Sequence, residues 1–332
     1  MKNQILLLSL VLAASVCFAQ KYKEDVALIM KDKKLMEIIP DILQVEILSE
    51  GHDWTEGPVW LPSEKKLLFS DIPRNSIYEW TEKGGLKLYL KPSGYTGSKP
   101  LNGEPGSNGL LLNSKGELVL CMHGDRQIAK MNSDLKHPKP DFITIANNYK
   151  GKKLNSPNDA VFHKNGDLYF TDPPYGLEFR MEDPLKELDY QGVYKVDKNG
   201  NIVLLTKELS RPNGIAFSPD YKKLYIANSD PENAIWMAYD VNEKGLIENG
   251  KKLFDVTDQN TAVTGNPDGM KVHKNGWIFA GGPRGIWIFT PEGEHLGTII
   301  TNEKTANCAF NEDYSQLFIT ADHYLLRVKL KK

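Results

Sequence analysis

Cysteine is scarce in this sequence: there are three in 332 residues, and no two of them form a CxxC pair. A zinc ribbon and a dithiol redox centre are therefore excluded. Cys17 lies in an apolar N-terminal run, which leaves Cys121 and Cys308 for a folded domain. An exported protein can pair two such residues, but two buried free thiols fit the sequence equally well.

An excess of positive charge is also absent. Lys and Arg total 41 against 43 Asp and Glu, which gives a formal net charge of −2. Without a basic stripe, we expect no nucleic-acid partner. The sequence has no GxSxG elbow, HExxH motif or phosphate-binding P-loop, so it does not carry the sequence signatures of those enzyme classes. The glycine-rich stretch 281–285 falls between predicted strands, and we interpret it as a turn.

Long apolar runs are limited to the N-terminus. Lys2 precedes the apolar stretch "ILLLSLVLAASV", which is too short for a comfortable membrane span. Residues 1–19 are therefore predicted to be a signal peptide cleaved after Ala19, which makes the mature protein periplasmic or secreted, without a membrane span. Lipidation of Cys17 is less favoured because the preceding Val16 is bulky. Residues 20–42 are predicted to form an N-terminal helical or linker segment, with an amphipathic helix ending near Pro40.

Helical periodicity is missing from the rest of the chain, which instead repeats one unit of short strands and polar turns. Six segments share this pattern: 57–80, 108–131, 158–177, 213–239, 268–289 and 307–328. One such unit cannot bury its own faces, whereas six packed around an axis can. The fold predicted for residues 43–332 is therefore an all-β, six-bladed β-propeller. The final unit lacks a fourth strand, and we expect residues 43–51 to supply it and close the ring.

An oxygen-bearing side chain stands at the start of the first strand in every unit. In a propeller these strands line the central channel, so the six side chains converge: Glu56, Asn108, Asn158, Asn213, Asp268 and Asn307. Turn formation explains one or two Asn residues, but not the whole set. Carboxylate and amide oxygens favour a hard divalent cation, with calcium first and magnesium or manganese as alternatives. Zinc ranks last, because it prefers His or Cys and neither stands at these positions.

A second polar ring follows the second strand of most units, on the same face of the propeller: Asp71, His123, Asp172, Asn228 and Asp322. These residues either face a substrate or hold the blade corners as turn residues. His123 is the only histidine among them, so it is a candidate proton carrier as well as an ordinary lining residue. Residues 177–194 form an insertion on the third unit, and we expect it to lie on the binding face as a lid.

Several stretches, in order, resemble the gluconolactonase/regucalcin lactonohydrolase family: "EGPVW", "SDIPRNSIYEW", "SPND", "FTDPPYGL", "RPNGIAFSPD", "NPDGM" and "NCAF". The resemblance spans roughly residues 45–330. It implies a six-bladed propeller with one divalent cation, usually calcium, in the central channel. By this resemblance the cation ligands are Glu56, Asn158, Asn213 and Asp268. Asn108, Asp172 and Asn307 are expected to contact the substrate or a neighbouring water.

The resulting hypothesis is an exported, metal-dependent lactonase that opens a sugar lactone to its aldonic acid. The cation polarises the lactone carbonyl, and Asp268 acts as the base or orients the water, with His123 as the second catalytic candidate. Direct attack by Asp268 is a further alternative. An arylesterase or phosphotriesterase-like hydrolase on the same metal, or a non-catalytic calcium- or sugar-binding propeller, are the competing functions. The sequence leaves the natural lactone and the oligomeric state open.

Overall fold

The computed structural model describes residues 20–261 and 263–331, and these form an all-β structure. The segment predicted to be a signal peptide lies outside the described residues. The helical elements in the described ranges are two short 3-10 helices, η1 (Lys33–Glu37) and η2 (Arg180–Glu182). Within those same ranges, no helix has the length and apolar character needed to cross a membrane.

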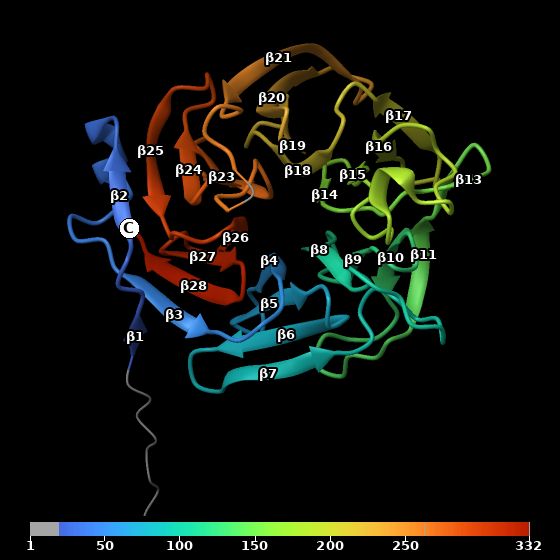
Figure 1. Cartoon of the computed structure of the whole chain (residues 1–332), viewed down its shortest axis with the longest axis horizontal. Helices are drawn as coiled ribbons and strands as arrows, with labels where there is room; N and C mark the ends of the chain where they lie inside the picture. The colour runs from blue at the N-terminus through green and yellow to red at the C-terminus, as the bar shows by residue number, and fades with distance from the viewer. Residues whose placement is uncertain (1–19, 262, 332) are drawn as a thin grey trace, which may run out of the picture.

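Six antiparallel sheets stand around a central axis like the blades of a propeller (Figure 1). From the axis outwards, the first blade contains β4 (Thr55–Leu61), β5 (Lys66–Asp71), β6 (Ser76–Thr81) and β7 (Gly85–Leu90). The second blade contains β8 (Ser107–Leu112), β9 (Leu118–Met122), β10 (Gln127–Met131) and β11 (Phe142–Ala146). The third blade contains β14 (Ala160–Phe162), β15 (Leu168–Asp172), β16 (Gly192–Val196) and β17 (Ile202–Thr206). A small hairpin of β12 (Asn148–Tyr149) and β13 (Lys152–Lys153) links the second and third blades.

In the same order, the fourth blade contains β18 (Pro212–Phe217), β19 (Lys223–Asp230), β20 (Asn233–Val241) and β21 (Ile247–Asp255). The fifth blade contains β22 (Met270–Val272), β23 (Ile278–Gly282), β24 (Gly285–Phe289) and β25 (His295–Ile300). The sixth blade contains β26 (Thr305–Phe310), β27 (Gln316–Ala321) and β28 (Tyr324–Lys329). The predicted six-bladed propeller is therefore confirmed. The first strand of each blade lies innermost, which places the repeated oxygen-bearing residues around the channel.

The ring closes between the two ends of the propeller sequence. Strand β3 (Val45–Ser49) pairs antiparallel with β28, with Ile47 opposite Leu326, and so supplies the fourth strand of the last blade. Within this pairing, the buried Arg327 donates to the buried Glu46 carboxylate. The prediction that residues 43–51 complete the sixth blade is confirmed, and a buried ion pair joins the two strands.

The prediction of an amphipathic helix in residues 21–42 is wrong. Strand β1 (Lys21–Tyr22) pairs with β3, and β2 (Ala27–Met30) pairs with β25 as a fifth strand of blade five. The outer edge of a blade offers unpaired backbone groups, and pairing with them overrides a weak local helix preference. Only η1 remains helical, and Leu35 within it is fully buried.

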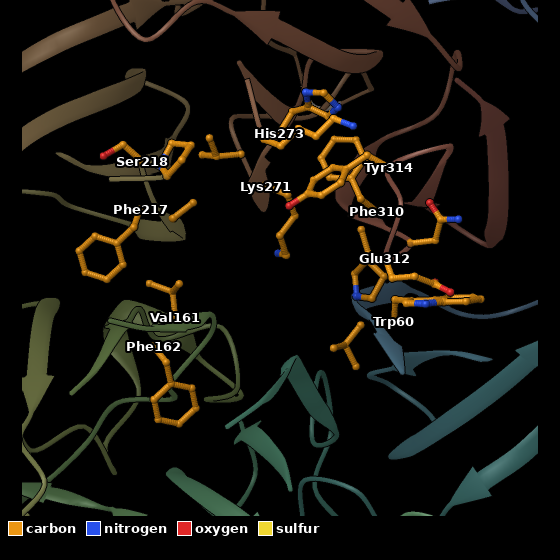
Figure 2. A pocket seen from close by; sticks show the side chains of 18 of the residues that line it. Trp60, Val161, Phe162, Phe217, Ser218, Lys271, His273, Phe310, Glu312 and Tyr314 are labelled. Atoms are coloured by element: carbon orange, nitrogen blue, oxygen red, sulfur yellow. The ribbon is translucent and has the colours of Figure 1, made fainter. Parts of the chain in front are cut away.

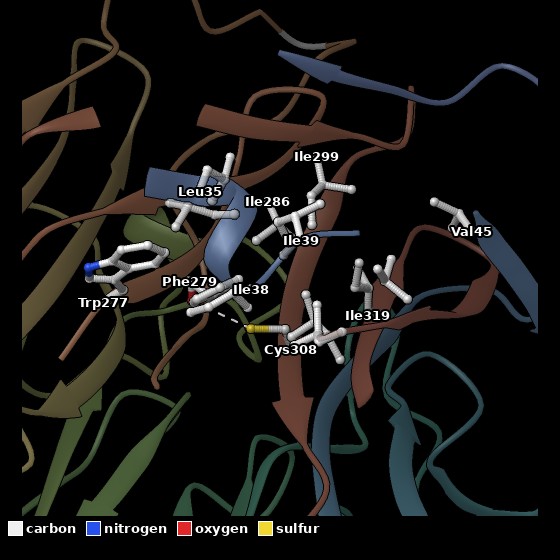
Figure 3. Packing of buried hydrophobic residues seen from close by; sticks show 14 of the residues in the cluster. Leu35, Ile38, Ile39, Val45, Trp277, Phe279, Ile286, Ile299, Cys308 and Ile319 are labelled. Carbon is white, nitrogen blue, oxygen red and sulfur yellow. Dashed lines mark hydrogen bonds between the residues drawn. The ribbon is translucent and has the colours of Figure 1, made fainter. Parts of the chain in front are cut away.

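The core consists of hydrophobic clusters between neighbouring blades. The cluster between blades five and six also receives Leu35, Ile38 and Ile39 from the N-terminal segment, so this segment covers the interface (Figure 3). Cys308 lies in this cluster and Cys121 in the cluster between blades two and three, and both are buried free thiols. The cysteines therefore pack as core residues of separate interfaces.

Candidate functional site

The repeated oxygen-bearing residues gather at one end of the channel. A cavity of about 350 Å³ opens there, and five of the six line it: Glu56, Asn108, Asn158, Asn213 and Asp268. The sixth, Asn307, is buried beside them and donates from Nδ2 to Glu56 Oε2 at 3.4 Å. Residues 251 positions apart in sequence thus meet because their blades are neighbours across the ring closure.

The backbone fixes the direction of the acidic side chains in this ring. Glu56 Oε2 accepts from the backbone N–H of Gly57 at 2.9 Å, and Asp268 Oδ1 accepts from that of Gly269 at 3.0 Å. Asn307 Oδ1 accepts from the next backbone N–H in the same way. Each side chain is therefore hydrogen-bonded to the backbone at the start of its own strand, which restricts its rotation.

Glycine at the next position allows the inner strands to approach closely. A Cβ on Gly57 would lie 1.9 Å from the backbone oxygen of Asn108, and the φ of Gly57 is +52°, in the left-handed region. A Cβ on Gly269 would lie 2.0 Å from the side-chain amide of Asn307. Only glycine leaves room for these contacts. At four of the six ring positions the sequence thus places a glycine directly after the oxygen-bearing residue: Gly57, Gly109, Gly214 and Gly269.

Hydroxyl groups of second strands join neighbouring blades at the ring. Ser70 Oγ donates to the backbone oxygen of Asn108 at 2.9 Å, and Thr171 Oγ1 donates to that of Asn213 at 2.7 Å. In both pairs the hydroxyl comes from the preceding blade. These bonds satisfy buried carbonyls and hold each ring residue against its neighbour.

Two of the four amide oxygens of the ring are buried without a hydrogen-bond partner in the described part of the chain. Within the residues that the structure describes, no donor reaches Asn108 Oδ1 or Asn213 Oδ1, although both side chains are nearly inaccessible to water. Asn213 Nδ2 donates to Ser229 Oγ at 2.8 Å, which directs the amide oxygen to the other side. Buried acceptors normally have a donor or a cation. Unpartnered amide oxygens beside two carboxylates form a donor set that fits a hard divalent cation.

The two carboxylates disfavour each other's charge. Burial raises the pKa of Glu56 to about 8, and the nearby Asp159 charge contributes to this rise. Burial and the Glu56 charge raise the pKa of Asp268 well above its ordinary value. A cation between the two carboxylates would offset both burial and repulsion. The electrostatics therefore agree with the donor set.

Two further charged residues lie at the channel, the acid Asp159 and the cation Lys271. Neither was predicted from the sequence. Asp159 is buried and its pKa is raised by burial, while the charge of Lys271 opposes that rise. Lys271 Nζ donates to Asn307 Oδ1 at 3.2 Å. Asp159 directly follows Asn158 in "SPND", so its position beside a predicted ligand was the available signal.

Three further residues line the cavity and were also missed: Glu104, Tyr175 and Arg180. Arg180 Nη2 lies 3.7 Å from Glu104 Oε1, and its guanidinium lies 5.7 Å from the centre of the Tyr175 ring. Burial raises the pKa of Glu104 to about 7, although Arg180 opposes the rise. Arg180 belongs to η2, so the insertion on the third unit does lie on the cavity face.

The structure does not bring Asp172 to the cavity. Its carboxylate is fully buried and accepts from the backbone N–H groups of Asn155 and Ser156, both at 2.8 Å. Asp71 accepts from backbone N–H groups in the same way, at 3.3 Å, and Asn228 Oδ1 accepts from one at 2.8 Å. These outer-ring residues hold the loop that leads into their own blade. Substrate contact by Asp172 is therefore not supported by its position.

His123 also lies behind the cavity rather than lining it. The ring is fully buried, and neither of its nitrogens has a hydrogen-bond partner among residues 20–261 and 263–331. Nδ1 lies 3.8 Å from Glu104 Oε2, so the histidine backs the glutamate that faces the cavity. Burial lowers the pKa of His123 to about 4, which leaves the imidazole neutral near pH 7. The position favours support of Glu104 over direct contact with substrate.

A separate acidic group lies outside this cavity lining. Glu303, Asp322 and His323 lie close enough for their ligand atoms to share an ion. Glu303 is already paired with Lys23, at 2.8 Å from its ammonium. The group contains Asp322 of the predicted outer ring, but its partly exposed acids do not join the inner ring.

The chain is similar to known proteins in both sequence and fold. The profile of the family described as SMP-30/Gluconolactonase/LRE-like region matches residues 54–323, nearly the whole propeller. The chain belongs to this family. A gluconolactonase from Zymomonas mobilis is 40% identical to it over 293 residues, which cover 86% of this chain and 81% of that protein.

Solved structures give the same assignment of the fold. A gluconolactonase from Xanthomonas campestris has a TM-score of 0.80 and 26% identity, covering 95% of this chain and 98% of its own. A calcium-binding regucalcin from Agrobacterium tumefaciens has a TM-score of 0.65 at 19% identity, covering 85% of this chain and 92% of its own. At that identity the regucalcin shows the shared fold alone. The predicted family resemblance is confirmed.

Proposed function

We propose that this member of the SMP-30/gluconolactonase family is an exported, metal-dependent lactonase that hydrolyses a sugar lactone to its aldonic acid. Family membership makes the chain a lactone-hydrolysing hydrolase. The observation that carries the finer proposal is the ring at one cavity, where carboxylates and unpartnered amide oxygens face one another.

The residues that would hold the cation are Glu56, Asn158, Asn213 and Asp268. Two carboxylates match the charge of a divalent ion, and amide oxygens complete a hard donor set, so calcium is the favoured ion. When bound, the cation would supply Lewis-acid polarisation of the lactone carbonyl. Magnesium, manganese and zinc stay as alternatives for direct test.

Asp268 is our candidate for the residue that orients the attacking water and accepts its proton. Its Oδ1 is held by the Gly269 N–H, which leaves Oδ2 to orient the attacking water and to accept its proton. Asp268 lines the cavity, whereas His123 does not. We therefore assign His123 a role in positioning Glu104, rather than a contact with the reacting atoms.

The lining of the cavity suits a polyol. Apart from Trp54 and Tyr175, it consists of polar side chains and one glycine, with Arg180 and Lys304 as its cations. Hydrogen-bonding groups of this kind match the ring hydroxyls of a sugar lactone, and Asn108 and Arg180 are positioned to bind them. An aryl ester would find only the rings of Trp54 and Tyr175 as aromatic walls among the described lining residues, so the sugar lactone is favoured over the arylesterase alternative.

The deciding experiment is a comparison of substrates on protein stripped of metal with EDTA and reloaded. Hydrolysis of glucono-δ-lactone, phenyl acetate and paraoxon is followed with calcium, magnesium, manganese or zinc, and spontaneous hydrolysis is subtracted. We expect the lactone to be the best substrate and Asp268→Asn to lose most turnover while keeping its fold. The matched control is Asp258→Asn, because Asp258 is an exposed residue outside the cavity lining.

A preference for phenyl acetate or paraoxon would replace the lactone by another ester. Cation binding without hydrolysis of any of the three would favour the binding-propeller alternative. Full activity of the Asp268→Asn variant would refute the role of Asp268.

Export is proposed from the N-terminal residues alone. Mass spectrometry of the full chain expressed with an intact export pathway would test it. We expect the mature protein to begin at Gln20 and to carry no lipid. A lipid-modified Cys17 at the new N-terminus would support the lipoprotein alternative instead.

A further inference from the structure

A second, larger cavity lies at the other end of the channel. It has a volume of about 490 Å³ and is lined by the far ends of the same inner strands that begin at the oxygen ring. The lining segments come from five blades: 58–62, 160–162, 215–219, 271–274 and 309–314. The proposed lactonase function makes no use of this cavity.

The walls of this cavity are apolar and aromatic. Figure 2 shows Trp60, Phe162, Phe217 and Tyr314 arranged around its opening, and all four line it. Trp60, Phe162 and Tyr314 are only partly buried, although apolar residues at the blade interfaces are closed off from water. A concentration of partly exposed aromatic side chains around one hollow is typical of a ligand site.

Lys271 supplies a cation at the centre of this hollow. Its side chain projects into the middle of the ring of aromatic residues (Figure 2). Nζ donates to the backbone oxygen of Met270 at 3.1 Å and to Asn307 Oδ1 at 3.2 Å. A lysine ammonium has three N–H donors, so one is left for a ligand. Asp159 interacts with Lys271 but does not line this cavity.

The rim of the cavity is also positively charged. Lys274 lies 5.6 Å from the centre of the Tyr314 ring, and Lys164 lies 5.8 Å from the centre of the Tyr221 ring. Both tyrosines line the opening, and Glu312 is the one carboxylate among the lining residues. Among the described residues that line the cavity, two lysines, Lys271 and Lys274, therefore stand against one acid. This charge complements an anion.

We propose that this cavity binds a small monocarboxylic acid with an aromatic or similarly apolar body. The carboxylate meets the free N–H of Lys271, and the apolar body packs against Trp60 and Phe217. The volume is that of a small-molecule site, for which roughly 300–1,000 Å³ is usual. A neutral compound, whether a sugar or an apolar molecule, would leave the ammonium of Lys271 unpaired.

The test uses para-fluorophenylbutanoate and its neutral counterpart para-fluorophenylbutanol, with dissociation constants measured by fluorine NMR on the full-length mature protein. We expect the acid to bind about tenfold more tightly than the alcohol, because it alone pairs with the lysine. Lys271→Met should remove this difference. Val161→Phe should weaken both probes by filling the cavity, while leaving lactone hydrolysis unchanged.

Lys304→Met is the control, because Lys304 lines the other cavity. Equal affinity of acid and alcohol for the wild-type protein would overturn the proposal. So would absence of binding, or acid binding that is lost in Lys304→Met and kept in Val161→Phe. If Lys271→Met fails to fold, Val161→Phe and the comparison of acid with alcohol still decide the matter. A failure here leaves the proposed lactonase function untouched.

Discussion

Replacing Glu56 by Gln should stabilise the protein when no cation is present. Glu56 is buried beside Asp268 and Asp159, and its pKa is raised from 4.5 to about 8. A carboxyl group whose pKa is higher in the folded protein than in the unfolded chain costs stability as the pH rises. The loss begins near the unfolded pKa and is complete above the folded pKa.

The size of this effect follows from the two pKa values. Near pH 7, the difference corresponds to about 3 kcal/mol of lost stability, which the Glu56→Gln variant regains. With an unfolding entropy of about 2.1 cal/mol/K per residue, this is a rise in Tm of about 5 °C. Glu56→Gln should also remove most of the further gain that calcium gives to the wild-type protein, because it removes one proposed ligand.

The assay is differential scanning calorimetry of EDTA-treated protein between about pH 5 and pH 8, without and with calcium. Glu243→Gln is the matched control, since Glu243 is exposed in a turn far along the sequence from the ring. The stability difference between wild type and Glu56→Gln should grow with pH in the absence of cation. A variant that is equal to or less stable than wild type near pH 8 would refute the argument that the carboxylates are crowded.

Three further substitutions test the framework by chemical denaturation. Gly57→Ala should cost at least about 2 kcal/mol, because its Cβ would lie 1.9 Å from the Asn108 carbonyl in a left-handed conformation; a loss below 1 kcal/mol, about half of this, would contradict it. Arg327→Met should cost about 3 kcal/mol, the lower end of the range for a broken buried ion pair, because Glu46 keeps Lys329 Nζ at 3.0 Å from its Oε1. A neutral result would show that the Arg327–Glu46 pair does not stabilise the ring closure. Thr171→Val should cost about 1–3 kcal/mol through the lost bond to the next blade, and unchanged stability would contradict this role of Thr171.

The inner ring could be predicted because the repeat fixes its register. Once each unit is aligned, residues such as Glu56 and Asn213 occupy equivalent places, and the propeller brings equivalent places together. The N-terminal segment could not be predicted in this way. Its strand β2 exists only because the free edge of β25, far away in sequence, accepts it. Local helix preference carried no information about that edge.

The loops were the other source of error and omission. An aspartate such as Asp172 suits a substrate contact and a blade corner equally well. Only the two backbone N–H groups that donate to its carboxylate show that it holds the corner. Glu104 precedes the second unit without any repeated pattern, so nothing in the sequence placed it beside Arg180. Residues outside the repeat register are positioned by tertiary packing, which local sequence does not report.

One measurement tests the metal-dependent lactonase most directly. Stripped protein is titrated with calcium, while the rate of glucono-δ-lactone hydrolysis and the Tm are recorded on the same samples. We expect activity to be lost on stripping and to return with calcium, with a half-maximal rate at the free calcium concentration that gives half-maximal stabilisation. Full activity of the stripped protein, or calcium stabilisation in Glu56→Gln equal to that of wild type, would contradict it.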